Sequence, residues 1–408
     1  MGNYTEDSKP PGYYIRQRLR RNKPAIFGLI VIIASFVFSI LGYLIMPDDT
    51  PNANDGAVQI QKQPPGFTAT FLKIRKNRVI DQKNFIQKAI YGQESEYMIV
   101  PIVDYEIEHL YVRAEIFGKL NYHKEYSILD IVKAKKGNPD EVTNESTGET
   151  MLIYENLNGL EESVSENDLI NEFQEYNIEK RTYWLGTDKM GRDMLSRLLF
   201  GTRISLSIGF IAVLISMFLG MSLGSIAGFF GGRIDMFILW FMSVVWSIPG
   251  IILVIAISMA LQSRGVWVAF VAVGLTMWVE VARVMRGQIM SIKEKLYVEA
   301  ARAFGIKNFR IVFVHIVPNI AGPLIVIATA NFAAAILLEA GLSFLGLGVQ
   351  PPTPSWGVMI YEGFQAIGTK NSLHLILFPG LAICILVLSF NLLGNGLRDA
   401  YDPKTLSE

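Results

Sequence analysis

The chain has 408 residues, of which 51% are hydrophobic and only 18% are charged, whereas soluble domains carry about a quarter charged residues. Its 37 basic and 37 acidic side chains cancel, so the charge gives no indication of nucleic-acid binding. A single cysteine, Cys384, excludes an internal disulfide framework and a cysteine-rich metal site. A mean hydropathy of +0.32 instead indicates a membrane protein.

Six segments are apolar enough to form membrane-spanning helices, which need about 20 residues. Their ranges are 25–46, 204–230, 236–261, 265–279, 318–338 and 375–397. Pro249-Gly250 should kink the third. Glu280 and Glu339 follow the fourth and fifth, and we expect both at membrane surfaces because a charge at mid-bilayer costs at least about 2.5 kcal/mol. The alternative is that they line a polar pathway.

The first span follows five basic residues, which is also how a signal peptide begins. Its 22 uncharged residues and the lack of a small-residue cleavage site after Met46 predict a retained anchor instead. The positive-inside rule places residues 1–24 in the cytoplasm, together with the loop 283–317, which holds seven basic and two acidic residues. Four spans separate these regions, and two more leave residues 398–408 on the cytoplasmic side.

Residues 47–183 form a long polar insert that this topology places outside the cell membrane. The 15 basic and 24 acidic side chains of residues 47–182 indicate a solvated surface or, alternatively, a docking surface for a partner. Alternation over 103–107 predicts a strand, and its phase changes near His109, as a bulge or a second strand would explain. A strand at 151–154, a helix at 168–178 and turns at Asn138-Pro139 and Thr147-Gly148 complete a predicted α+β domain.

Residues 184–203 combine charges with four apolar residues at helical spacing, which predicts a helix in the outer interface. Within the second span, glycines recur every four residues and indicate close packing against another helix; they are Gly220, Gly224 and Gly228. Residues 220–224 also fit the motif G-x-S-x-G of a hydrolase nucleophile elbow. That motif requires a strand-to-helix turn, whereas these residues lie inside a predicted membrane span.

No catalytic or metal site is indicated. Gly186 and Gly191 have the spacing of a phosphate loop, but Arg192-Asp193 follows where lysine and a hydroxyl residue are needed. Asp188 and Asp193 flank Lys189 and Arg192, so mutual neutralisation of charge explains these carboxylates better than acid–base chemistry does.

The loop 283–317 contains a short predicted helix from Glu299 to Phe304, which Gly305 can end in the left-handed conformation. Pro318 suits the first turn of the fifth span. The pattern by itself is that of a connector lying along the membrane surface.

This segment resembles the EAA loop of ABC-importer permeases, which reads E-A-A, three residues, Gly, nine residues, then I-x-L-P. Glu299, Ala300, Ala301, Gly305 and Pro318 match, whereas positions 315 and 317 depart from it. In such permeases the loop forms a coupling helix that docks into the ATPase. The resemblance therefore implies coupling contacts at Tyr297, Glu299, Ala300, Ala301, Gly305 and Ile306.

Four further stretches resemble the second permease subunit of oligopeptide/dipeptide importers, namely 185–197, 342–348, 350–357 and 391–403. The likeness covers residues 15–46 and 184–404 and leaves the insert outside. It implies an all-α polytopic membrane protein with the type I permease fold of six transmembrane helices, with a five-helix core over 204–397.

The resemblance also implies the function: an inner-membrane permease that imports peptides by alternating access. The chain is not expected to be an enzyme or to bind a cofactor, because ATP and Mg would be bound by two ATPase partners. A second permease and an external solute-binding protein would complete the complex. Nickel, glutathione or another small solute is the alternative cargo. One alternative is a standalone secondary transporter, but it would show internal repeats and mid-span charges, which we do not see. Another is a receptor whose main function lies in the outer domain, but six spans exceed what anchoring requires.

Overall fold

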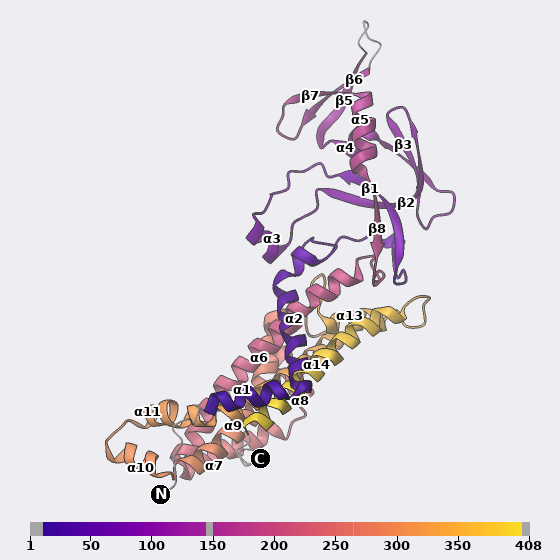
Figure 1. Ribbon diagram of the computed structural model, residues 1–408. Coiled ribbons are helices and arrows are strands. Elements are labelled where there is room, and N and C mark those ends of the chain that lie inside the picture. The colour runs from indigo at the N-terminus through magenta and orange to yellow at the C-terminus, as the bar shows by residue number, and fades with distance from the viewer. Residues whose placement is uncertain (1–10, 144–149, 264, 402–408) are drawn as a thin grey trace. The chain divides into compact units, whose positions relative to one another are not determined.

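The computed structural model describes residues 11–143, 150–263 and 265–401 (Figure 1). The chain divides into two compact units. The helical unit comprises Met1–Ser39, Gly201–Tyr361 and Phe378–Glu408, and the sheet unit comprises Ile40–Phe200 and Glu362–Leu377.

The N-terminal region forms two helices separated at Asn22. Helix α1 spans Pro11–Arg21 and α2 spans Lys23–Ile45. The Asn22 side chain accepts a hydrogen bond from the Ala25 amide at 3.1 Å, which caps the start of α2. After Lys23, α2 has no charged residue, so it is the helix expected for the first span.

Within the described residues, five helices are long and apolar enough to cross a membrane. They are α2, α6 (Met194–Phe230), α9 (Val266–Ile292), the segment Asn308–Phe344 and α14 (Leu373–Tyr401). The segment Asn308–Phe344 consists of α11 (Asn308–Arg310), a π-helical turn (Ile311–Ile316), a 3-10 turn (Val317–Ile320) and α12 (Ala321–Phe344).

The kink expected at Pro249-Gly250 is confirmed and is sharp. Helices α7 (Gly232–Trp246) and α8 (Gly250–Ala260) are bent by 94°, and they account for a sixth span if the pair crosses as one. A helix that the sequence did not reveal, α13 (Trp356–Phe364), precedes α14.

One expected helix boundary is wrong, and one helix extends beyond its predicted span. Residues 184–193 form turns and an isolated bridge between Thr187 and Asp193, rather than the first half of an interfacial helix over 184–203. Helix α6 then runs unbroken from Met194. Helix α9 does not end before Glu280 but continues to Ile292, and the Glu280 side chain is exposed, as expected.

The three glycines of α6 pack against α9, as their spacing predicted. A Cβ atom at Gly224 would lie 2.5 Å from the Ala282 carbonyl oxygen, and one at Gly228 would lie 2.8 Å from the Arg286 carbonyl oxygen. The backbones of α6 and α9 therefore approach closely only because these positions lack side chains.

We expect Gly224→Ala to destabilise the chain by about 1–3 kcal/mol, because the two helices must separate to admit the methyl group. Gly287→Ala is the matched control, since Gly287 lies in α9 with no atom within 4 Å of a Cβ there. Thermal unfolding in detergent should show a lower midpoint for Gly224→Ala alone. Equal midpoints would contradict the close packing.

The sheet unit holds two antiparallel sheets. The larger has the order β4-β3-β2-β1-β8, with strands β1 (Phe67–Arg75), β2 (Tyr97–Glu108), β3 (Tyr111–Ile116), β4 (His123–Ser127) and β8 (Ile178–Tyr183). The smaller has the order β5-β6-β7, with strands β5 (Lys135–Thr143), β6 (Thr150–Asn156) and β7 (Glu161–Ser165).

Three short helices accompany the sheets, namely α3 (Phe85–Tyr91), α4 (Ile128–Val132) and α5 (Glu166–Glu172). Helices α4 and α5 share a core with both sheets, in which Leu72, Leu129, Leu152 and Leu169 are buried. The strands and helices thus bury apolar side chains away from water in this shared core, and this burial stabilises the unit.

The expected strands at 103–107 and 151–154 are present in β2 and β6. The phase change at His109 marks the boundary of two strands, with His109 at a φ of +51° in the turn. Asn138-Pro139 lies inside β5 at an irregular register, which corrects the expected turn, whereas Thr147-Gly148 lies outside the described residues. The helix predicted at 168–178 is present as α5 and a π-helical turn, Phe173–Asn177, and β8 begins at Ile178.

Candidate functional site

The loop between α9 and α12 contains α10, which spans Leu296–Ala303. Its alanines, glutamate and arginine are good helix formers. Glu299 in the first turn and Arg302 in the last turn complement the helix dipole. The helix ends as predicted: Gly305 has a φ of +74°, and its amide bonds to the Arg302 carbonyl oxygen at 2.9 Å. The Ile306 amide bonds to the Ala301 carbonyl oxygen at 3.1 Å, which completes a Schellman motif.

One face of α10 is fixed to the helical unit. Val298 and Ala301, three residues apart, are buried in an apolar cluster formed with α6, α9 and the start of the following helical segment. Other buried members are Phe229, Met285, Ile289, Ile311, Val312, Ile316, Ile320 and Leu324. Ile306 packs against this cluster, and the Arg302 guanidinium lies 4.8 Å from the centre of the Phe229 ring. The helix therefore cannot move without disturbing α6 and α9.

The opposite face of α10 and the residues that follow present apolar side chains to the outside. Leu296 is 82% exposed, Phe304 is 85% exposed and Phe309 is 74% exposed. A polar loop on a solvated surface has no reason to hold three such side chains, so this face fits a protein partner. Clustered aromatic and aliphatic residues of this kind dominate the binding energy of interfaces.

The expected coupling residues stay a prediction, and they differ in exposure. Tyr297, Glu299, Ala300 and Gly305 are exposed, so a partner can reach them. Ala301 is buried and Ile306 is half-buried, because both belong to the inner face of the loop. The range 297–306 that the resemblance implies includes Phe304 but leaves out Leu296 and Phe309. Their apolar character, outside the buried i, i+3 pair of Val298 and Ala301, was the signal that could have added them.

We expect Gly305→Ala and Gly305→Val to loosen α10, because a left-handed residue with a Cβ costs about 1–2 kcal/mol. Gly305→Asn should be milder, since asparagine tolerates this conformation. Hydrogen-exchange protection of residues 298–306 measures the effect. Gly346→Ala is the control: its φ is +75°, and like Gly305 it has no atom within 4 Å of a Cβ. Unchanged protection in Gly305→Val would contradict this role.

A buried charge cluster in the sheet unit joins the segment before α6 to the end of α13. Arg192 lies 2.6 Å from Asp188 and 3.3 Å from Glu362, and Arg197 lies 3.2 Å from Asp188 and 3.4 Å from Glu362. Lys189 reaches Glu362 at 3.6 Å. The predicted neutralisation between Asp188 and Arg192 is confirmed. Removing one partner from such a cluster typically costs about 3–5 kcal/mol.

Two further carboxylates stabilise the same region. Asp193 accepts hydrogen bonds from the Ser196 amide at 2.7 Å and the Ser196 hydroxyl at 2.5 Å, which caps α6. Asp48 accepts bonds from Thr50 and from the Asp55 amide. Burial outweighs these bonds and raises the pKa of Asp48 from 3.8 to about 6.

Because the pKa of Asp48 is higher in the folded chain, its protonation favours folding. Its contribution to stability is greatest below about pH 4 and is lost as the pH rises through about 6, a change of about 3 kcal/mol. We therefore expect the unfolding temperature of the wild type to fall relative to Asp48→Asn between about pH 4 and about pH 7. Parallel pH profiles for the two proteins would contradict this assignment.

Glu339 is fully buried in the helical unit, which corrects its expected position at the membrane surface. Its carboxyl group accepts hydrogen bonds from Ser343 at 2.7 Å, Ser355 at 2.8 Å and Ser205 at 3.4 Å. Three hydroxyl donors from separate segments replace the water that the carboxyl loses. They could not be identified from the sequence, because they are 4, 16 and 134 positions away.

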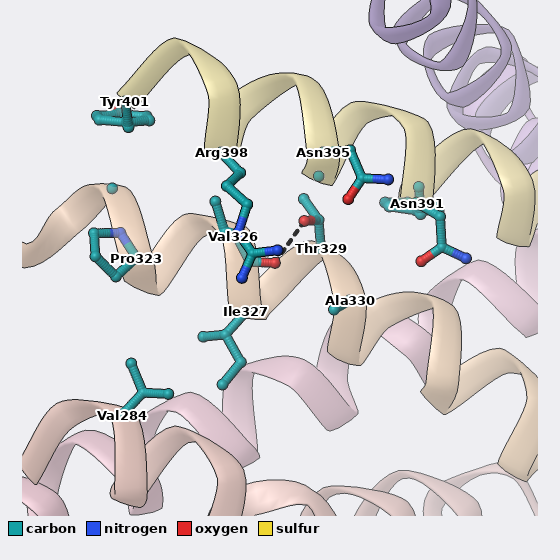
Figure 2. A pocket seen from close by; sticks show the side chains of 13 residues that line it. Val284, Pro323, Val326, Ile327, Thr329, Ala330, Asn391, Asn395, Arg398 and Tyr401 are labelled. Atoms are coloured by element: carbon teal, nitrogen blue, oxygen red, sulfur yellow. Dashed lines mark hydrogen bonds between the residues drawn. The ribbon is translucent and has the colours of Figure 1, made fainter. Parts of the chain in front are cut away.

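Described residues of the helical unit line three cavities. The largest, of about 540 Å³, is formed by α9, α12 and α14 and is mainly apolar, with Thr329, Asn391, Asn395 and Arg398 as polar groups. In Figure 2, Arg398 extends from α14 toward Val326 and Thr329 of α12. A cavity of about 290 Å³ lies between the end of α6 and the segment that begins at Asn308, and Phe309 is among its lining residues. A cavity of about 270 Å³ lies at the bend between α7 and α8, and Glu280 is among its lining residues.

Two families match the chain. Residues 220–407 match "Binding-protein-dependent transport system inner membrane component", and residues 11–65 match "N-terminal TM domain of oligopeptide transport permease C". Residues 66–219, which include most of the insert, are matched by neither.

Three related proteins are similar over about half of the chain. The dipeptide transport system permease protein DppC of Alkalihalophilus pseudofirmus is 43% identical over 225 residues, covering 55% of this chain and 73% of the relative. The glutathione transport system permease protein GsiD of Pectobacterium atrosepticum is 42% identical, covering 55% and 74%. The oligopeptide transport system permease protein OppC of Bacillus subtilis is 41% identical, covering 55% and 72%.

Proposed function

The chain belongs to the family of binding-protein-dependent transport inner membrane components, and on this premise we propose that it imports peptides as one of two permeases in an ATP-driven complex. The observation that carries the proposal is α10, a short helix with one face packed on α6 and α9, together with the exposed apolar side chains of Leu296, Phe304 and Phe309 in and after it. ATP hydrolysis takes place in separate ATPase partners that dock on this face.

The packing of α10 supplies a mechanism for coupling. A displacement of α10 by a closing ATPase is transmitted through Val298 and Ala301 to Met285 and Ile289 of α9. Helix α9 also packs against the glycine stripe of α6, so both helices move with it. For ATP to drive import, the ATPase must bind α10 more tightly in one of the two permease conformations, since equal affinities shift nothing.

Orientation follows from charge. The basic residues of α1 and of the loop 283–317 support a cytoplasmic location for the N-terminus and for α10. Six crossings, with α7 and α8 counted as one, then place the C-terminus in the cytoplasm and residues 47–183 on the outer side of the inner membrane. An external solute-binding protein delivers the cargo on that side.

The names of the relatives favour peptides as the cargo. DppC and OppC are named for dipeptide and oligopeptide transport, and GsiD is named for glutathione, which is itself a modified tripeptide. The similarity to permease C at residues 11–65 favours the second permease subunit of such a complex. Glutathione is the alternative cargo that a specific relative supports.

We expect Leu296→Ala and Phe304→Ala to weaken ATPase binding about tenfold each, because exposed apolar anchors carry interface energy. Co-purification of the ATPase with the detergent-solubilised permease measures this. Leu160→Ala is the matched control, because Leu160 is 64% exposed in the turn between β6 and β7. Undiminished co-purification in both α10 variants would overturn the proposed docking face.

Reconstitution of the purified complex in vesicles then tests the cargo. Uptake of a labelled dipeptide that unlabelled peptides inhibit, and that glutathione inhibits only weakly, is the expected result. Uptake of glutathione without uptake of peptides would show that glutathione is the cargo, and it would leave the proposed coupling site unchanged. A chain that purifies without any ATPase would favour a standalone transporter instead.

A further inference from the structure

The connection between β1 and β2 is much longer than the sheet requires. These strands are antiparallel neighbours paired as far as Arg75 and Tyr97, so a turn of about 2–5 residues would join them. Residues 76–96 instead leave the sheet, form α3 and return. Connections of this length in compact domains commonly serve a function of their own.

Helix α3 is capped at both ends and buries none of its own residues. Asn84 and Gln87 form a capping box, and Gly92 ends the helix with a φ of +68°. Phe85 is 71% exposed and Ile86 is 69% exposed, and at 100° per residue they share one face with Ala89 and Ile90. The helix is therefore a preformed apolar surface.

The other side of α3 is attached to the end of α2. Lys88 forms an ion pair with Asp49 at 2.9 Å, and the Gln93 amide bonds to the Asp49 carbonyl oxygen at 3.0 Å. Gly92 lies so close to Tyr43 that a Cβ atom there would be 2.7 Å from its ring. Tyr43 is in the last turn of α2, which ends at Ile45 after a long, mainly apolar run without a charged residue.

We propose that α3 is an interfacial anchor that inserts Phe85 and Ile86 into the surface of the membrane that α2 spans. The end of an apolar spanning helix lies at the boundary between lipid headgroups and acyl chains, and the contacts with Asp49 and Tyr43 hold α3 at that level. Amphipathic helices bury their apolar face about 5–10 Å into this boundary.

A lipid surface explains the position of α3 better than a protein partner does. The attachment holds α3 next to the end of α2, and the end of a spanning helix lies at the bilayer surface. Lipid is therefore next to α3 whether or not a protein partner is bound. The anchor would also hold one corner of the large sheet, because residues 76–96 return directly into β2. This inference needs only that α2 spans the membrane and does not depend on the cargo or on the ATPase.

The test uses the full chain with Cys384→Ser, which removes its one cysteine. Phe85→Cys is labelled with an environment-sensitive fluorophore and reconstituted in vesicles of phosphatidylethanolamine and phosphatidylglycerol that contain a shallow spin-labelled lipid. Leu160→Cys, another exposed apolar position of the sheet unit, is the matched control. We expect blue-shifted emission at position 85 and quenching about threefold greater than at position 160.

Water-like emission and equal quenching at the two positions would overturn the anchor. A blue shift at position 85 that develops only after a solute-binding protein is added would also overturn it and would assign α3 to that partner. Ile86→Cys provides a second labelling site on the same face, so misfolding of one variant leaves the test intact.

Discussion

The constraint on which the helical unit depends is the absence of water inside a bilayer. Every backbone amide and carbonyl in hydrocarbon must find its partner within the protein, so the apolar segments form helices. Side chains follow the same rule. Glu339 is enclosed by three serine hydroxyls, and the α6 helix lies against α9 through glycines because lipid provides no hydrophobic drive for association.

Charge is tolerated where it is paired. Arg197, in the first turn of α6, is among the largest fully buried side chains, and Asp188 and Glu362 lie within 3.5 Å of it. Such a cluster is a weak source of stability compared with apolar packing, but it specifies which segments meet. Here it fixes the end of α13 to the turns that precede α6, two segments about 165 residues apart in sequence.

The two apolar surfaces that remain exposed have a common design. Helix α3 is capped at both ends and α10 is capped at its C-terminus. Each is attached on one side, while aromatic and aliphatic residues in the helix or next to it are exposed. The attachment explains why each surface is ordered without its partner. We infer that α10 meets a protein and α3 meets lipid, since α10 is packed on helices that must move and α3 is attached to the end of a span.

Local sequence patterns were enough to predict the apolar segments, the bend at Pro249-Gly250, the end of α10 at Gly305 and several strands of the insert. These features depend on local composition, periodicity and backbone preference, which a single segment carries. Local patterns were wrong about Glu339, which is buried, and about residues 184–193, which form turns. These features depend on tertiary contacts, because the energy of a charge depends on which distant groups replace its water. The hydroxyls around Glu339 come from three segments, and the attachment of α3 to α2 joins residues more than 40 positions apart, so neither is recorded in a local pattern.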